Sequence, residues 1–495
     1  MNKTNLLSEL RKDGTIFIAA IFILLLRLVF IPLMGPMPQD AYYYFYSQHP
    51  ALSYFDHPPA IAYLLRFFTA VFGRNVFALK LADSVVTMFS LIAFYKLGKC
   101  FLSIHKAQRA FLLFFSTFMV TILSLVSTPD TPLILFWTLS LISLYHAVFL
   151  EKNIYWIWAG ISMGLAFDSK YTALLLPMGI VFFLIVSKQY RKKLLSPWLW
   201  ISLLLFVIII SPVVIWNVQN GFASFKFQSA SHLETENSHH FEISNFFGVI
   251  GHQSAIMLPV LFLSFFWFLF KIIKKYKFKI FKIDDKQLFL LCFFIPAFAG
   301  FLAISFVAWV KLNWMMPAYI TGIIWVSVYL NQKWTKAQII ISAILHLLVS
   351  IEVLFYPFPV RSDDTWVGWK ELSQQVEVLQ NSHPNSFIFS ADDYKTSAML
   401  NFYLGEMVYG RNVIGEPALQ FDYIGTNLNE LKGKDALFID SDPHFKDELK
   451  SNKIPPSLTN YFDSVVEDDP IVIKKDGEII RKFFVYECKD YHFNK

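Results

Sequence analysis

The stretch PMPQDAYYYFYSQHPALSYFDHPPAIAYLL, Pro36 to Leu65, decides how the rest of the chain is interpreted. It follows an apolar run of about 20 residues, the length that a membrane-spanning helix needs. Yet the stretch itself holds two carboxylates, two histidines and a dense run of tyrosines. Lipid cannot solvate such groups, and a plain connection between two spans could be far shorter. We therefore predict a long loop outside the membrane, either a chemical site or an elaborate linker.

The composition of the whole chain is that of a polytopic membrane protein. Of its 495 residues, 55% are hydrophobic and only 16% are charged, which is more apolar than a soluble domain of this length. The mean hydropathy is +0.47. Cys100, Cys292 and Cys488 have no metal-ligand spacing and indicate neither a disulfide framework nor a zinc site. The net charge of +6 is modest, and no nucleic-acid partner is expected.

Apolar runs of spanning length predict about eleven membrane-crossing helices. The runs cover residues 14–35, 77–97, 109–127, 131–150, 154–169, 171–187, 197–216, 246–270, 287–307, 317–331 and 338–357. Lysine and arginine are concentrated in alternate loops, which places the N-terminus in the cytoplasm. The first run lacks a small-residue cleavage site and is interpreted as a retained helix. The expected location is a bacterial inner membrane that the chain crosses several times.

The composition changes at about Arg361, after the last predicted span. Helical patterns there alternate with short apolar runs, SFIFSA, DALFID, DPIVIKK and KFFVYEC, which are typical of strands. An odd number of spans places this tail on the outer, periplasmic face. We therefore predict a membrane domain over residues 1–357, with a first outer loop at about 36–76. A small α/β domain over residues 358–495 follows it.

The first outer loop carries Asp40 directly after the first span and Asp56 next to His57. A carboxylate at the membrane–water boundary can act as a general base, or can bind a metal ion or a hydroxylated substrate. The structural alternative is that Asp40 caps a short helix and that Asp56 and His57 form a turn before a proline. Apolar residues at helical spacing later in the loop predict a helix in the membrane interface.

Single charged residues recur in the other outer turns. They are Asp130, Asp168 with Lys170, Lys226 amid aromatic residues, and Lys311 close to Asn313. Turn and capping chemistry explains Asp130 well, and Asp168 with Lys170 could be a mere surface pair. However, charges so near the membrane plane are costly and tend to be functional. Lysines in such turns suit an anionic, partly lipidic ligand that approaches from outside.

At this point the chain resembles the bacterial glycosyltransferase family 39 group. This group is related to protein O-mannosyltransferases and to the aminoarabinose transferases of lipid A. The resemblance rests on DAYYYFYSQHPALSYFDHPPAIAYL, TPDTPLILFW, GLAFDSKYTALLLP, PVVIWNVQNGFASFKFQ, KLNWMMPAY and FSADDYKTSAMLNFYLG, in the order of the family. It implies the mainly α GT-C fold, with a helical membrane core, a long first outer loop and an outer soluble domain.

The resemblance also implies the reaction. Such enzymes move a sugar from a polyprenyl (undecaprenyl) phosphate carrier to an envelope acceptor, with inversion at the anomeric carbon. A carboxylate of the first loop, Asp40 or Asp56, would be the general base or would orient the acceptor. Lys170, Lys226, Lys311 and His57 would hold the donor phosphate, which needs cationic or metal stabilisation as it leaves. Further cavity residues are Gln39, Tyr43, Asp130, Asp168 and Tyr394, for which packing is the alternative.

The chain departs from the family at one position. Members usually carry an Asp-Glu pair before the Ala-Tyr-Tyr element, but here the pair is Gln39-Asp40. Either Asp40 alone serves as base, or the acceptor is acidic enough to need less help, or the enzyme is degenerate. His57 stands where the lipid A transferases carry a lysine. It would bind phosphate when protonated, or share a divalent cation with Asp56; no other cofactor is expected.

Three functions compete on these residues. The first is a transferase that modifies lipid A, lipopolysaccharide or another envelope glycan, with a protein O-glycosyltransferase as its nearest variant. The second is a transporter or flippase of a lipid-linked sugar. Transporters tend to show internal repeats and polar residues at mid-membrane, whereas the polar residues here lie at the outer helix ends. The third is a non-catalytic scaffold, which the amide of Gln39 would allow. Neither the sugar nor the acceptor is readable from the sequence.

Overall fold

A computed structural model gives the fold of residues 31–231, 241–451 and 453–493, with scattered positions between 14 and 28. The chain forms two compact units. The first contains residues 57–61 and 80–350, and the second contains residues 30–56, 62–79 and 351–495. The predicted first span, 14–35, lies largely outside the described residues, and the predicted domain boundary near residue 357 stays a prediction.

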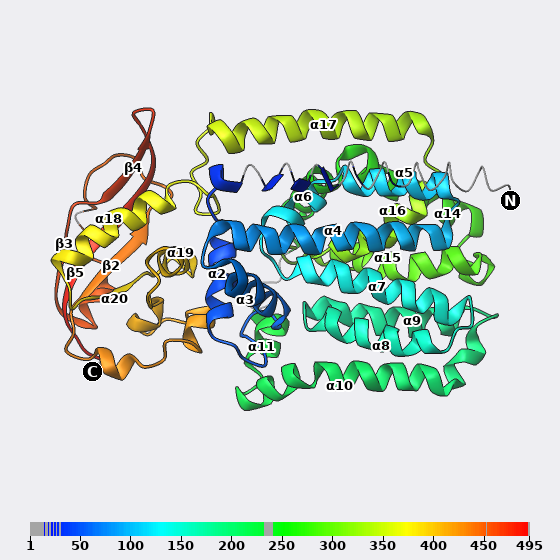
Figure 1. Cartoon of the computed structure of the whole chain (residues 1–495), viewed down its shortest axis with the longest axis horizontal. Coiled ribbons are helices and arrows are strands. Elements are labelled where there is room, and N and C mark those ends of the chain that lie inside the picture. The colour runs from blue at the N-terminus through cyan, green and yellow to red at the C-terminus, as the bar shows by residue number, and fades with distance from the viewer. Residues whose placement is uncertain are drawn as a thin grey trace. The chain divides into compact units, whose positions relative to one another are not determined.

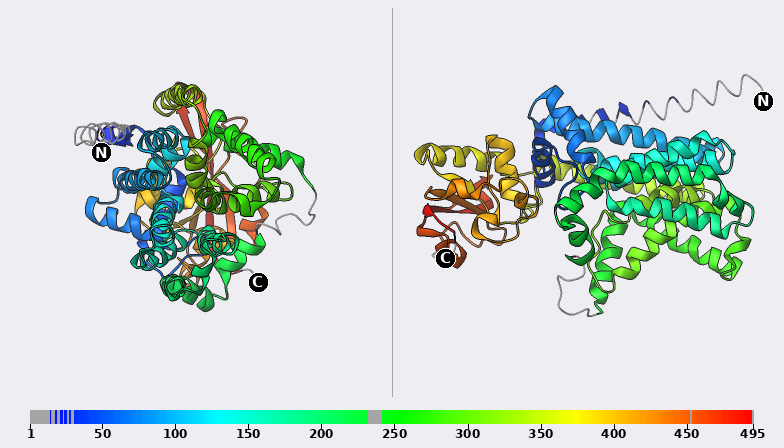
Figure 2. Two further views of the ribbon diagram at one scale, coloured as in Figure 1. Left: turned by 90° about the vertical axis from the view of Figure 1, so that its right-hand side faces the viewer. Right: turned by 90° about the horizontal axis from the view of Figure 1, so that it is seen from below.

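The first unit is a bundle of apolar helices that run side by side (Figure 1) and are seen end on in Figure 2. Five described helices are long and apolar enough to cross a membrane: α4 (Val76–Phe101), α7 (Asp130–Val148), α10 (Pro197–Gln219), α15 (Asp285–Ile304) and α17 (Gln332–Phe355). Shorter apolar helices are α8 (Ile154–Phe167), α9 (Leu175–Val186) and α16 (Met316–Ser327). The predicted total of about eleven spans stays a prediction.

Two predicted spans are bent in the structure. The run 109–127 forms α5 (Ile104–Phe115) and α6 (Phe118–Leu125), which meet at 62°. Ser116 and Thr117 at this break donate side-chain hydrogen bonds to the carbonyls of Leu113 and Phe114, at 2.8 and 2.7 Å. Such local bonds compete with the backbone bonds of a continuous helix.

The prediction of one continuous helix over 246–270 is wrong. The chain forms α13 (Ile243–Met257) and α14 (Pro259–Tyr276), bent by 115°. Leu258 between them has a φ of 64°. Pro259 lacks an amide hydrogen and disfavours helical geometry at the residue before it, so α13 ends there.

Burial separates the helices of the bundle into inner and outer ones. In α10 and α17, only 22% and 11% of the most apolar stretch is buried, and α17 lies along the margin of the bundle (Figure 1). Apolar faces so exposed are suited to lipid. The close packing of α8 on α10 depends on Gly160, where a Cβ would stand 2.4 Å from the carbonyl oxygen of Ser202. Small residues allow such close helix approach in membranes.

The second unit is built on a five-stranded sheet with the order β1-β2-β5-β3, and β4 also pairs with β5. The strands are β1 (Phe387–Phe389), β2 (Ala436–Ser441), β3 (Phe462–Glu467), β4 (Ile471–Lys475) and β5 (Glu478–Tyr491). β1 is parallel to β2, and the other pairs are antiparallel. The four predicted strand runs are confirmed, and β3 was not predicted.

The second unit also contains the helices α2 (Pro38–Gln48), α3 (Ala60–Phe72), α18 (Trp369–Ser382), α19 (Lys395–Leu404) and α20 (Pro456–Thr459). Three of these helices, α18, α19 and α20, contact strands of the sheet, and α2 packs on α19. α3 is the helix that the apolar spacing in the first outer loop predicts. Short helical turns complete the chain: η1 (Ile31–Leu33), η2 (Tyr171–Leu174), η3 (Arg191–Leu195), α11 (Ala223–Lys226), η4 (Phe227–Ser231), η5 (Ile280–Lys282), η6 (Arg411–Ile414), η7 (Leu419–Asp422) and η8 (Leu428–Leu431).

Candidate active site

The predicted site residues fall into two groups, one in each unit. The first unit holds Asp130, Asp168, Lys170, Lys226, Lys311 and His57, and the second holds Gln39, Asp40, Tyr43, Asp56 and Tyr394. The peptide bond between Asp56 and His57 is one of the places where the chain passes from one unit to the other.

A buried ion pair forms the centre of the group in the first unit. The ammonium of Lys170 lies 2.9 Å from both carboxylate oxygens of Asp130. Lys170 is 5% exposed and Asp130 is 1% exposed. Asp130 is the first residue of α7, where the helix dipole favours a negative charge. The amide of Asn313 donates a third hydrogen bond, of 2.6 Å, to the same carboxylate. Residues from three separate turns therefore meet at one point.

The partner of Lys170 is thus Asp130 and not its sequence neighbour Asp168. Burial lowers the pKa of the Lys170 ammonium, the nearby Asp130 carboxylate opposes this shift, and the positive charge of Lys311 adds to it. Lys311 therefore lies close enough to Lys170 to affect its pKa, although the side chain of Lys311 is exposed. Asn313 and Lys311 share the turn that leads into α16, so one turn supplies both a hydrogen bond and a charge to the cluster.

The same network fixes the turns that carry the cluster. Gln253 of α13 donates to the carbonyl of Leu312 at 2.9 Å, and the hydroxyl of Tyr319 donates to Gln253 at 2.6 Å. On another side, the hydroxyls of Tyr171 and Ser224 lie 2.6 Å apart. Lys226, two residues after Ser224, is exposed at the end of α11. The hydrogen bond between Tyr171 and Ser224 therefore brings the turn of Lys226 next to the residue that follows Lys170.

Asp168 and the start of α3 are linked through the backbone. The carbonyl of Asp168 accepts a 3.0 Å hydrogen bond from the amide of Ala60, three residues after His57. One carboxylate oxygen of Asp168 is buried and has no hydrogen-bond partner among the described residues. His57 therefore belongs to the same end of the bundle as Asp168.

Two fully buried charges on α4 were not predicted. The ammonium of Lys80 donates to the carbonyl of Leu125, and Asp83 accepts a 2.8 Å hydrogen bond from the hydroxyl of Ser127. Both charges hold the end of α6 and the turn that leads to Asp130. The signal in the sequence was the pair of charges three residues apart in an otherwise apolar helix, where an ionisable residue is functional by default.

In the second unit, Asp40 caps α2, as the structural alternative predicts. Its carboxylate accepts a 2.7 Å hydrogen bond from the amide of Met37, and the side chain is fully buried. The neighbouring Gln39 donates to Asp364 at 3.1 Å, and Asp364 also pairs with Lys395 at 3.2 Å. The amide that replaces the usual acid thus serves as a donor to a carboxylate.

The carboxylate of Asp56 lies close enough to two stacked tyrosines to affect them electrostatically. The rings of Tyr42 and Tyr394 stack with centroids 4.2 Å apart, which is the packing alternative for Tyr394, and its place in a cavity stays a prediction. Burial raises the pKa of both phenols, and the Asp56 carboxylate raises them further. Tyr43 packs against the same tyrosine cluster and is 7% exposed. A carboxylate near stacked aromatic rings is a suitable surface for a sugar, whose apolar face stacks on rings and whose hydroxyls need acceptors.

A metal centre of several ligands does not occur in the part of the chain that the structure describes. No group of three or more His, Cys, Asp or Glu side chains there is placed to hold an ion. Asp56 and His57 would supply two ligands at most, so a divalent cation stays a prediction.

Comparison with known proteins places this geometry in a family context. Residues 56–216 match the family described as dolichyl-phosphate-mannose-protein mannosyltransferase. The chain is 22% identical over 413 residues to the lipid A galacturonosyltransferase RgtD of Rhizobium johnstonii, covering 81% of this chain and 85% of that protein. It is 31% identical over 123 residues to an undecaprenyl phosphate-alpha-4-amino-4-deoxy-L-arabinose arabinosyl transferase of Pseudomonas savastanoi, covering 24% and 23% of the two chains.

The fold is also that of a solved structure. ArnT from Cupriavidus metallidurans bound to undecaprenyl phosphate matches with a TM-score of 0.61 at 13% identity, over 94% of this chain and 97% of that one. The apo form of the same protein matches with a TM-score of 0.60. The resemblance and the GT-C fold predicted from the sequence are therefore confirmed.

Proposed function

We propose that this membrane protein of the GT-C glycosyltransferase group transfers a sugar from undecaprenyl phosphate to lipid A or a similar glycolipid. The relatives named above modify lipid A or use an undecaprenyl phosphate-linked sugar, and an ArnT of the same fold binds the carrier. We place the reaction at the outer face of a bacterial inner membrane, with the N-terminus inside, on the distribution of lysine and arginine.

The observation that carries the proposal is the cationic cluster around Lys170. Three lysines, Lys170, Lys226 and Lys311, come from three turns, and a single carboxylate, Asp130, pairs with Lys170. With Asp168 at the same end of the bundle counted as well, the formal charges leave an excess of one positive charge. Such an excess suits the phosphate of a lipid-borne donor. Asp130 holds the Lys170 ammonium in place, so no reorganisation is needed when charge develops on the leaving group.

The transfer itself needs one bond to form and one to break. An acceptor oxygen bonds to the anomeric carbon as the bond from that carbon to the carrier phosphate oxygen breaks, with inversion. The phosphate keeps the bonding electron pair and leaves as polyprenyl phosphate. If the acceptor is a hydroxyl, its proton goes to a carboxylate of the first loop, Asp40 or Asp56. If the acceptor is a phosphate, no base is required, which would be consistent with the amide at Gln39.

A cavity in the second unit supports a glycolipid acceptor. It has a volume of about 690 Å³. Four cations, Arg74, Lys370, Lys474 and Lys475, line it with one acid, Glu371, and its other walls include the apolar Leu33 and Val353. Phosphate groups attached to acyl chains would complement such a surface. Among the residues that the structure describes, no comparable feature favours a protein acceptor.

The proposal is tested by mass spectrometry of envelope lipids and glycans from wild-type, deletion and Lys170→Met strains. We expect one mass, equal to a sugar residue on a lipid A species, to vanish in the deletion strain and to fall at least 100-fold in Lys170→Met, the loss typical of one electrostatic group. The matched control is Lys193→Met, which removes a partly exposed lysine paired with the exposed Glu151 at 3.2 Å and should leave the mass unchanged.

Other outcomes would replace the proposal. If the sugar disappears from a protein and not from a lipid, the chain is a protein O-glycosyltransferase. If the deletion strain accumulates a lipid-linked sugar while every acceptor stays unmodified, the purified protein must be tested for transfer. Absence of transfer with a donor that the cells accumulate would favour the transporter.

A further inference from the structure

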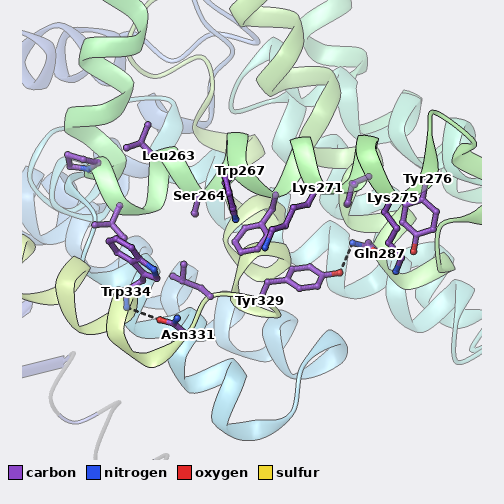
Figure 3. A pocket seen from close by; sticks show the side chains of 15 residues that line it. Leu263, Ser264, Trp267, Lys271, Lys275, Tyr276, Gln287, Tyr329, Asn331 and Trp334 are labelled. Atoms are coloured by element: carbon purple, nitrogen blue, oxygen red, sulfur yellow. Dashed lines mark hydrogen bonds between the residues drawn. The ribbon is translucent and has the colours of Figure 1, made fainter.

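A groove in the first unit lies outside the candidate active site. It has a volume of about 790 Å³ and runs along α14, between that helix, the start of α15 and the turn from α16 to α17. Figure 3 shows side chains of α14 on one side of the groove and Tyr329, Asn331 and Trp334 on the other. None of the residues discussed above as site residues lines it.

The charged residues that line the groove all have one sign. They are Lys271 and Lys275, one helical turn apart on the same face of α14, and no acidic residue joins them in the lining. The ammonium of Lys271 lies 5.1 Å from the ring centroid of Trp267, and that of Lys275 lies 4.8 Å from the ring of Tyr276. Aromatic faces attract these cations without neutralising them, so both remain able to bind an anion.

The wall opposite α14 is held by hydrogen bonds, two of which come from cationic side chains. Gln287 donates a 2.9 Å hydrogen bond to the hydroxyl of Tyr329. Behind that wall, Lys106 donates to the carbonyl of Val328 at 3.0 Å and Arg109 donates to the carbonyl of Leu330 at 2.7 Å. These bonds fix the turn from α16 to α17 and add positive charge next to the two lysines.

The rest of the groove is apolar and open. Leu263 is 62% exposed, Trp267 57% and Trp334 50%. Tryptophan, tyrosine and lysine together are typical of the membrane–water boundary, where one end of a side chain meets lipid and the other meets water. The groove therefore offers an anion site and an apolar channel side by side, which is the polarity of a phospholipid.

We propose that this groove binds one anionic phospholipid. Its phosphate lies between Lys271 and Lys275, and an acyl chain lies against Leu263, Trp267 and Trp334. The complementary charge favours an anionic over a zwitterionic lipid, because a zwitterion brings its own cation to the two lysines. This site is independent of the transferase proposal, since it uses other residues and another lipid.

The test is native mass spectrometry of the full-length protein in detergent, titrated with dioleoyl phosphatidylglycerol or with dioleoyl phosphatidylcholine. The two lipids carry the same chains, so a difference reports the headgroup. The groove variant is Lys271→Gln with Lys275→Gln. The control is Lys274→Gln with Lys279→Gln, which removes the same charge from the same segment outside the groove lining.

We expect the wild-type protein to retain one phosphatidylglycerol more strongly than phosphatidylcholine. A lysine near a membrane surface contributes about fivefold in binding an anionic lipid, so the groove variant should bind about 30-fold more weakly. The control should bind as the wild type does. Equal loss in both variants would mean unspecific charge attraction and would overturn the proposal. So would equal retention of both lipids, or displacement of phosphatidylglycerol by equimolar undecaprenyl phosphate.

Discussion

Replacing Asp130 by asparagine should separate the structural from the chemical role of the ion pair at the centre of the candidate site. The variant keeps the size of the side chain and an oxygen that can accept from Asn313, but it removes the negative charge. The ammonium of Lys170, 5% exposed, is then left without its anionic partner. A buried charge that has lost its partner cannot regain its solvation.

The magnitude follows from the burial of both groups. Breaking a buried ion pair by removing one member costs about 3 to 5 kcal/mol. The lost favourable interaction of Asp130 with the N-terminus of α7 adds up to about 1 kcal/mol. In contrast, breaking the partly exposed pair of Lys193 and Glu151 should cost less than about 1 kcal/mol. The apparent midpoint of thermal unfolding should therefore fall clearly for Asp130→Asn and barely change for Lys193→Met.

A double variant, Asp130→Leu with Lys170→Met, tests the effect of removing both charges together. Replacing both members of a buried pair with apolar residues of similar volume is often neutral or stabilising, so the unfolding midpoint should return close to that of the wild type. Transfer of sugar, measured by product mass spectrometry with purified protein, should stay at least 100-fold reduced, because the cation that we propose to bind the donor phosphate is gone.

The result that would refute this reasoning is recovery of both properties. If the double variant unfolds like the wild type and also transfers sugar at the wild-type rate, the pair is only a structural link between turns. If the double variant stays as unstable as Asp130→Asn, the burial of the pair does not have the energetic consequence we assign to it.

Three further predictions concern the second unit. Asp40→Asn should keep the cap of α2, because the amide oxygen still accepts the hydrogen bond, yet reduce transfer about 100-fold if this carboxylate is the base; unchanged transfer would point to another base. Burial and the Asp440 carboxylate raise the pKa of Asp392 to about 8. The native state therefore binds more protons than the unfolded state between about pH 4 and 8, and stability should fall as pH rises through this range. Asp392→Asn should flatten that dependence in thermal unfolding at pH 5 to 8. Arg481→Met should destabilise the protein by about 3 to 5 kcal/mol, because its carboxylate partner is buried, whereas the exposed ion pair broken by Lys474→Met should matter by less than about 1 kcal/mol; equal unfolding midpoints would contradict this.

The elements that depend on local sequence were predicted well. The apolar runs that became α4, α7, α10, α15 and α17 gave clear signals, because lipid requires long apolar helices with all backbone groups bonded. Short apolar runs likewise indicated four of the strands. The break at Leu258 was missed although Pro259 lies in the run, since proline is tolerated in membrane helices when neighbours satisfy the freed groups.

The site was harder to predict because its contacts join distant turns. Lys170 was singled out as an outer cation that could hold a phosphate, and that role stays a prediction. Its burial was not predicted, and its partner is 40 residues away in sequence and not the adjacent Asp168. Hydrophobic periodicity locates each turn without saying which turns meet. The burial of Lys80 was missed for the same reason, because the carbonyl that accepts its hydrogen bond lies at the end of another helix. The cap at Asp40, in contrast, involves residues three positions apart, and it was among the predicted alternatives.

The second unit is built from the first loop together with the C-terminal tail, and this constrains how the protein can change during evolution. Phe45 of α2 stacks on Phe421 with ring centroids 4.5 Å apart, and Tyr42 stacks on Tyr394. A soluble tail exchanged between paralogues by recombination would arrive without the α2 that completes its core, and it would expose aromatic surface prone to aggregation. The first loop and the tail must therefore be inherited together, although some 300 residues separate them. A new acceptor specificity would be expected to arise through paired substitutions at both ends of the chain, not through the exchange of a module.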